Sequence, residues 1–303
     1  MSGPEIVAGE VITSAAKSVG ASALESRKNA RAELLEAAKG TPEFERAGQN
    51  YAKRIAIREE LVTKLYYPIA KMLGVSQEYF ANDFAQDMAG KLEGVPEENL
   101  ISPKPSIAAP ALEGLTYSLD EPDLKDLYLN LLKTASDNRS NEDVHPSFVR
   151  VIREMASEEA RLISMLFKER EAVLPSARIK IKTGRENGGS IFFSRHVMAF
   201  VDERGEPTVV RHLATYVDNW VRLGLVDTSY SSYLTRENAY DWVKERPEYS
   251  DAIKKIATDA TLQQDIATVE FDKGYIRLSD FGQLFAQAVS LGAEESLDAP
   301  ATE

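Results

Sequence analysis

The stretch DEPDLKDLYLNLLKTASD, residues 120–137, decides the fold of the central part of this chain. Its apolar side chains recur every three or four residues, the spacing of one buried helix face: Leu124, Leu127, Tyr128, Leu131, Leu132 and Ala135. Proline costs no hydrogen bond in a first helical turn, and acids there suit the positive end of the helix dipole. We therefore expect a one-sided helix that begins near Pro122 and packs against neighbours.

Two further helices are expected after this one. The first has Phe148, Val149, Ile152 and Met155 on its apolar face and begins after His145-Pro146-Ser147. The second carries Leu162, Ile163, Leu166 and Phe167, with Ser157 as the expected N-cap. Because the connections are short, residues 100–172 are predicted to form an antiparallel helical bundle.

Residues 1–95 predict a separate region of amphipathic helices. One runs from Ile6 to Ala23, a long one runs from Tyr51 to Gly74, and another covers Phe80 to Leu92. Several prolines follow and predict either an extended linker or first-turn positions, because proline lacks the donor that a helix interior needs: Pro96, Pro103, Pro105 and Pro110. We place a domain boundary there.

After Pro175 the hydrophobic period falls towards two, which predicts strands. Ile179 and Ile181 alternate with basic residues, and Asn187-Gly188-Gly189 supplies hairpin-turn residues. The pattern then predicts a helix over 209–226, strands at Tyr230–Leu234 and Tyr275–Leu278, and a closing helix.

These are the parts of a winged helix, over residues 176–290, with a helical insertion at 236–269. Residues 292–303 predict an acidic disordered tail. The expected fold class is mainly α, a helical bundle followed by a winged-helix-like α+β domain with a small β-hairpin.

The composition excludes several classes of chemistry. The chain of 303 residues has no cysteine and three histidines, which removes disulfides, thiolate nucleophiles, iron–sulfur clusters and thiolate zinc sites. We expect no metal, no cofactor and no identifiable catalytic residue. No run of about 20 apolar residues is present, so we expect a cytoplasmic protein without a stable membrane span.

Several segments in order resemble the Abi-alpha (abortive infection alpha) family of bacterial phage-resistance proteins. They are residues 111–115, 120–124, 127–132, 135–137, 145–148, 157–160, 223–226 and 278–282. The resemblance covers roughly residues 100–290 and implies a role in abortive infection, in which an infected cell stops growing before phage progeny spread. It brings no established catalytic residues. The family-motif candidates are Asp120, Glu121, Pro122, Asn130, Asp137, His145 and Pro146.

Asp137 and His145 allow two interpretations. If the two side chains lie within hydrogen-bond reach, Asp137 could orient His145 for proton transfer, and the protein would be an enzyme with a cryptic site. Alternatively, both residues satisfy backbone groups at helix ends while Asn130 bonds across the bundle. We favour the second interpretation.

The segment 168–195 carries seven basic and three acidic residues in a chain of net charge −12. Its candidate nucleic-acid ligands are Lys180, Lys182, Arg185 and Arg195, with Phe192 and Phe193 available for stacking. A solvated hairpin face is the alternative. Residues 201–303 hold 10 basic and 19 acidic side chains, which disfavours binding of the winged-helix-like domain to nucleic acid, since phosphate neutralisation supplies most non-specific affinity.

The sequence therefore predicts an antiphage defence protein that acts by protein–protein interaction or sensing. A protein partner or a phage component is expected, and a second copy of the chain is a further candidate. A nucleic-acid-binding regulator that uses the basic hairpin and an enzyme with a site near Asp137 and His145 are the alternatives.

Overall fold

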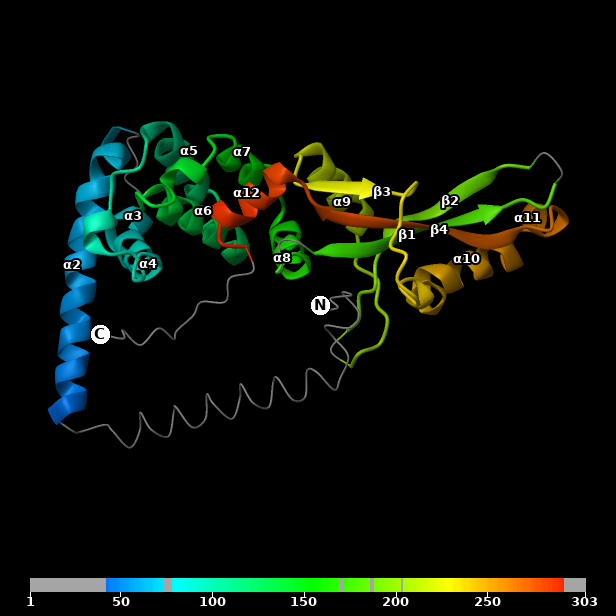
Figure 1. The fold of residues 1–303 in the computed structure, drawn as a ribbon, viewed down its shortest axis with the longest axis horizontal. Coiled ribbons are helices and arrows are strands. Elements are labelled where there is room, and N and C mark those ends of the chain that lie inside the picture. Colours follow the sequence, from blue (N-terminus) through cyan, green and yellow to red (C-terminus); the bar gives the residue numbers. More distant parts are fainter. Residues whose placement is uncertain (1–41, 73–77, 169–171, 186–187, 203, 292–303) are drawn as a thin grey trace. The chain divides into compact units, whose positions relative to one another are not determined.

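The computed structural model describes residues 42–72, 78–168, 172–185, 188–202 and 204–291. The chain is mostly helical with one four-stranded antiparallel sheet (Figure 1). Its contacts divide it into two compact units. We refer to the described residues 42–168 and 281–291 as the helical unit and to residues 172–280 as the sheet unit. The helix expected from Ile6 to Ala23 and the expected tail at 292–303 lie outside the described residues.

The helical unit is built on α2 (Pro42–Met72), α5 (Pro105–Thr116) and α6 (Pro122–Ala135). The remaining elements are α3 (Glu78–Asn82), α4 (Phe84–Lys91), η1 (Glu97–Asn99), η2 (Asn141–Asp143), α7 (Phe148–Arg153), α8 (Ser157–Leu166) and α12 (Asp280–Ala288). Helix α6 lies at the centre, in contact with α4, α5, α7 and α8.

The apolar stripe predicted in residues 120–137 forms the core of this unit. Leu127, Leu131, Leu132 and Ala135 are buried, and α6 begins at Pro122 as expected. The core is joined to α2 through Tyr66, whose hydroxyl donates to the Leu132 carbonyl at 3.0 Å and lies 2.6 Å from Ser136 Oγ. Burial of this length of helix face is what stabilises the unit.

Three local expectations in the helical unit need correction or detail. The stripe Phe80–Leu92 is divided between α3 and α4. Of the two alternatives for the proline-rich segment, Pro105 takes a first-turn position, that of α5, and Pro110 lies inside the same helix. Ser157 is the first residue of α8, not its N-cap; the cap is Ala156, whose N–H is accepted by Glu159 Oε2 at 2.8 Å.

The sheet unit is organised around two long strands. Strands β1 (Val173–Lys182) and β4 (Thr268–Leu278) pair from Val173 opposite Arg277 to Lys182 opposite Thr268. Strand β2 (Ser190–Val197) adds to β1 and β3 (Val226–Ser229) adds to β4, so the order is β2-β1-β4-β3. The expected hairpin of β1 and β2 is confirmed.

Helices cover part of this sheet. They are α9 (Leu213–Arg222), η3 (Asp241–Glu245), α10 (Pro247–Thr258) and α11 (Ala260–Gln264). Ala177, Ile179 and Ile181 of β1 form a core with Val243 and Ala252, so the elements expected as an insertion at 236–269 cover one face of the sheet. Since strand side chains alternate between faces, Arg178, Lys180 and Lys182 lie on the opposite face.

The prediction of a strand at Tyr230–Leu234 is wrong, because the strand in this part of the chain is β3, which ends at Ser229. The chain turns at Gly224, with φ of 75°, and β3 begins directly at Val226. Val226 is buried opposite Leu278, and this burial selects the earlier segment. Helix α9, strands β3 and β4 and helix α12 follow one another in the expected order. By its contacts, however, α12 belongs to the helical unit from Phe281 onwards.

Candidate functional site

The first family-motif candidates form the entry of α6. Asp120 and Glu121 are exposed, and the Glu121 carbonyl accepts the Lys125 N–H at 2.9 Å. Pro122 is the first helical residue and borders a cavity. These residues therefore fix where α6 starts.

Asn130 is buried in α6, and its Nδ2 donates to Asp126 Oδ2 at 2.9 Å, one turn earlier in the same helix. This hydrogen bond lies within α6 and is not the bond across the bundle that we expected. Instead, Asn130 holds the Asp126 carboxylate at the edge of the cavity.

Asp137 and His145 each have a local partner. Asp137 Oδ1 accepts the Arg139 N–H at 3.0 Å and its Nε–H at 2.9 Å, and Arg139 Nη2 lies 2.5 Å from Oδ2. The hydrogen bonds from Arg139 hold the pKa of the Asp137 carboxyl below its ordinary value. His145 is exposed, follows the turn after Asp137 and precedes Pro146; its Nδ1 lies 2.5 Å from Ser147 Oγ. No hydrogen bond joins the Asp137 and His145 side chains.

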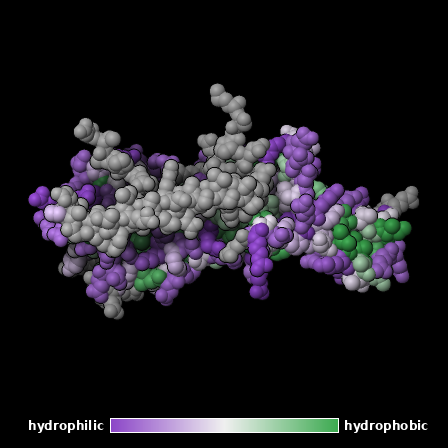
Figure 2. All heavy atoms as spheres, turned by 90° about the horizontal axis from the view of Figure 1, so that it is seen from below, coloured by the Kyte–Doolittle hydropathy of each residue, from purple (hydrophilic) through white to green (hydrophobic). Residues whose placement is uncertain are grey.

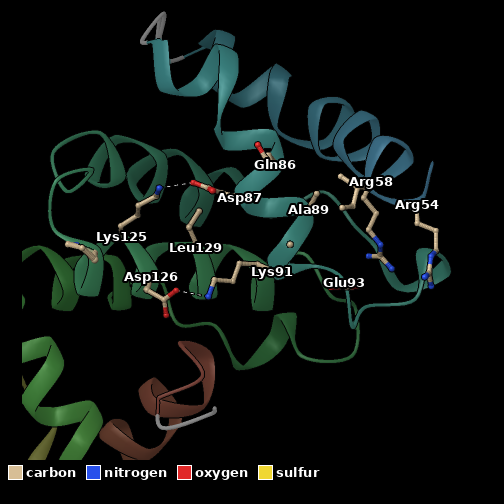
Figure 3. A pocket seen from close by; sticks show the side chains of 13 residues that line it. Arg54, Arg58, Gln86, Asp87, Ala89, Lys91, Glu93, Lys125, Asp126 and Leu129 are labelled. Atoms are coloured by element: carbon tan, nitrogen blue, oxygen red, sulfur yellow. Dashed lines mark ion pairs between the residues drawn. The ribbon is translucent and has the colours of Figure 1, made fainter. Parts of the chain in front are cut away.

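The cavity of about 510 Å³ lies in the helical unit among α2, α4 and α6 (Figure 3). Its apolar lining consists of Ile55, Ala89, Pro122 and Leu129, and its charged lining of Arg54, Arg58, Asp87, Lys91, Glu93, Lys125 and Asp126. Cavities of this volume bind small molecules when a few polar groups converge on an apolar wall.

Two ion pairs cross between α4 and α6 at this cavity. Lys125 Nζ lies 2.7 Å from Asp87 Oδ2, and Lys91 Nζ lies 2.5 Å from Asp126 Oδ1 (Figure 3). The Tyr79 hydroxyl also donates to Asp87 Oδ2 at 2.6 Å. Burial raises the pKa of the Tyr79 phenol far above its ordinary value, so this hydroxyl remains a donor. The sequence analysis did not identify the cavity, because its walls come from three helices distant in sequence.

The basic hairpin of the sheet unit is largely paired with carboxylates. Lys180 Nζ lies 2.6 Å from Asp272 Oδ1, and Lys182 Nζ lies 3.3 Å from Glu270 Oε1. Both carboxylates lie on β4, because the β1–β4 register places Lys180 opposite Glu270.

Arg185 Nε donates to Asp265 Oδ1 at 2.6 Å. Arg195 differs from the other three candidates, since no carboxylate pairs with it among the described residues; its guanidinium lies 5.7 Å from the Phe192 ring centroid. The four candidates therefore present far less free positive charge than their sequence suggests.

A buried polar chain in the sheet unit was missed by the sequence analysis. His196 Nδ1 lies 2.9 Å from the Tyr230 hydroxyl, which lies 2.9 Å from Ser176 Oγ. His196 Nε2 lies 3.2 Å from Asp218 Oδ1 on α9. No spacing in the sequence signals these contacts, because the four residues come from separate elements.

The backbone at His196 has a φ of 50°, a left-handed conformation that is uncommon for a residue with a side chain. Burial lowers the pKa of the His196 imidazole, against the opposing effect of Asp218. Gly274 makes room for the Tyr230 ring, since a Cβ there would lie 2.8 Å from Tyr230 Cε1. Ser176 is 1% exposed, so this chain of groups fixes the local structure and presents no accessible nucleophile.

Two other kinds of feature are absent from the part of the chain that the structure describes. No group of three or more His, Cys, Asp or Glu side chains there is arranged to hold a metal ion. Within the same residues, no helix is long and apolar enough to cross a membrane.

Comparison with known proteins identifies a family. No curated protein and no solved structure matches the chain significantly. The family model of abortive infection alpha matches residues 76–289. This range contains α4, α6 and the whole sheet unit, and it leaves out the α2 wall of the cavity. Because the match covers well over half of the sequence, the chain belongs to the abortive infection alpha family.

Proposed function

We propose that this protein defends a bacterial cell against phage by abortive infection, and that it acts in the cytoplasm by binding a protein partner or a phage component rather than by catalysis. The family match over residues 76–289 is the observation that carries the proposal. Membership of this family suggests phage defence, and the contacts of the candidate residues support the mode of action.

The contacts of Asp137 and His145 favour a non-catalytic role. A general base must be within hydrogen-bond reach of the group that orients it. Here the Asp137 carboxylate is occupied by Arg139, and His145 bonds to Ser147. Both residues thus stabilise the turns around η2, which supports binding over the alternative of an enzyme.

The ion pairs of the hairpin favour a protein partner over nucleic acid. Phosphate binding would require Lys180, Lys182 and Arg185 to exchange carboxylates for phosphates, while Asp265, Glu270 and Asp272 would repel the backbone. Each new contact with a phosphate would replace an existing contact with a carboxylate, so the net electrostatic gain on binding would be small. We therefore expect weak affinity for DNA and RNA.

Exposed apolar side chains supply a surface for such a partner. Figure 2 shows hydrophobic residues gathered over the end of the sheet unit that carries α11. Ile266, two residues after the end of α11, is 77% exposed, and Ile191 on the edge strand β2 is 65% exposed. A Cβ on Gly184 of the hairpin would lie 3.2 Å from Ile266 Cβ, so the hairpin and Ile266 are adjacent. Contiguous exposed apolar side chains mark protein interaction sites.

The order α9, β3, β4 and α12 supports a winged-helix-like description of this part of the chain. The 19 acidic side chains against 10 basic ones in residues 201–303 favour its use in protein contacts rather than in reading DNA.

Phage challenge at low and high multiplicity tests the proposal. We expect wild-type protein to protect the culture only at low multiplicity, and Ile266→Asp to abolish this protection, because a carboxylate at an apolar contact must be desolvated on binding. Val209→Asp is the matched control, a 50% exposed apolar residue of the same unit.

Circular dichroism must show that all variants fold. Unchanged phage plating, burst size and survival in a strain deleted for the gene, across a broad phage panel, would contradict the antiphage role. Loss of protection by folded protein with Lys180, Lys182, Arg185 and Arg195 changed to Ala would instead favour nucleic-acid binding.

A further inference from the structure

The aspartates that line the cavity of the helical unit already have partners. Asp87 is bound by Lys125 and Tyr79, and Asp126 is bound by Lys91 and Asn130. Each ion pair is close to neutral, so the two lysines and two aspartates contribute little net charge to the cavity.

Two arginines on α2 bring positive charge that no carboxylate matches. Arg54 makes no hydrogen bond or ion pair within the described part of the chain, and it borders the cavity (Figure 3). Arg58, one turn further along the same helix, donates to the carbonyls of Leu92 and Val95, so its position is fixed while its charge stays unmatched. Glu93 is the one lining carboxylate without an ion pair in the described residues. Two guanidinium groups against one carboxylate leave the α2 side of the cavity positive.

The cavity combines this charge with an apolar wall and with a hydrogen-bond acceptor. Guanidinium groups bind phosphate through two parallel hydrogen bonds, more strongly than they bind neutral groups. Ile55, Ala89 and Leu129 provide apolar surface. Lys125 and Tyr79 both bind Asp87 Oδ2, so Asp87 Oδ1 is available to accept a hydrogen bond from a hydroxyl or amino group. A ligand that matches all three features has a phosphate, a flat apolar body, and a donor at its edge.

From this combination we infer that the cavity binds a nucleoside monophosphate. Arg54 holds the phosphate at the open side, with the charge of Arg58 beside it, and the base lies against Ile55, Ala89 and Leu129. The volume of about 510 Å³ is within the range of small-molecule sites. The inference rests on the cavity alone and does not depend on the proposed antiphage function.

Isothermal titration calorimetry of the full chain with AMP, GMP, CMP and UMP tests this inference. We expect saturable binding of at least one of the four, and at least about tenfold weaker binding by Arg54→Ala, because a charge-assisted hydrogen bond is lost. Glu93→Gln should bind the same nucleotide more tightly, since it removes the one unpaired carboxylate. Both positions are exposed, so the fold should tolerate either substitution.

Arg46→Ala is the matched control, because it removes the same charge from an exposed position on α2, two turns from Arg54 and outside the cavity lining. Equal weakening by Arg46→Ala and Arg54→Ala would show unspecific attraction and overturn the inference. It would also be overturned by the absence of binding of all four nucleotides at millimolar concentration, or by binding of the corresponding nucleoside as tightly as its monophosphate. None of these results changes the phage challenge, so the two proposals fail independently.

Discussion

Replacement of Gly114 by Ala should destabilise the helical unit through a single contact between α5 and α6. A Cβ at Gly114 would lie 2.6 Å from Tyr128 Cζ and 2.9 Å from Cε1, and it would also meet the hydroxyl. Carbon atoms pack at about 3.5–4.0 Å, so the ring must move by roughly 1 Å. Tyr128 is 1% exposed, and the surrounding core resists that movement.

The expected cost follows from two opposing effects. Overpacking of a core costs about 1–3 kcal/mol, while Gly→Ala within a helix gains about 0.5–1 kcal/mol. Gly48→Ala in α2 isolates the gain, because a Cβ there meets nothing within 4 Å. The difference between the two variants therefore leaves the overpacking cost of about 1–3 kcal/mol.

Urea unfolding followed by far-UV circular dichroism measures this difference as a shift of the midpoint at constant slope. Both tryptophans, Trp220 and Trp242, lie in the sheet unit, so their fluorescence follows the other unit separately. Gly114→Ala combined with Tyr128→Phe should recover part of the loss, because the hydroxyl is among the atoms that the new methyl group meets. If Gly114→Ala unfolds at the same urea concentration as Gly48→Ala or at a higher one, Tyr128 does not pack against Gly114 and the reasoning fails.

Three further predictions concern charged and titratable groups. Arg246→Ala should cost about 3–5 kcal/mol in urea unfolding, because it leaves Glu248, 3.0 Å from the buried guanidinium, unpaired; a loss under 1 kcal/mol would contradict this. Burial lowers the folded pKa of His196, so stability should be full above the ordinary value of 6.5 and fall as the pH drops below it. Tryptophan fluorescence unfolding at several pH values would show this, and His196→Gln should flatten the dependence. Arg139 lowers the pKa of Asp137, so stability from this group is present above pH 3.8 and lost as the pH falls below that value; Asp137→Asn should weaken this part of acid unfolding, and an unchanged acid titration would count against it.

The sequence predicted the parts of the fold whose physical cause is local. The apolar period of residues 120–137 predicted α6, and alternation at Ile179 and Ile181 predicted β1 of the hairpin. It did not predict β3, because Val226 is selected as a strand by burial opposite Leu278, which lies 52 residues away in the chain. Periodicity reports which face of an element is apolar, but not what covers that face.

The candidate site also separates features that follow from local sequence from features that depend on tertiary contacts. The sequence alone determined the family, the absence of cysteine and scarcity of histidine, and the positions of α6 and of the β1–β2 hairpin, because these depend on residue type and spacing. Only the tertiary structure decided that the basic residues of β1 face the carboxylates of β4, that Asp137 bonds to Arg139, and that Arg54 borders a cavity with α4 and α6. Charge can be counted along a chain, but its effect depends on the partners that folding brings within a few ångströms.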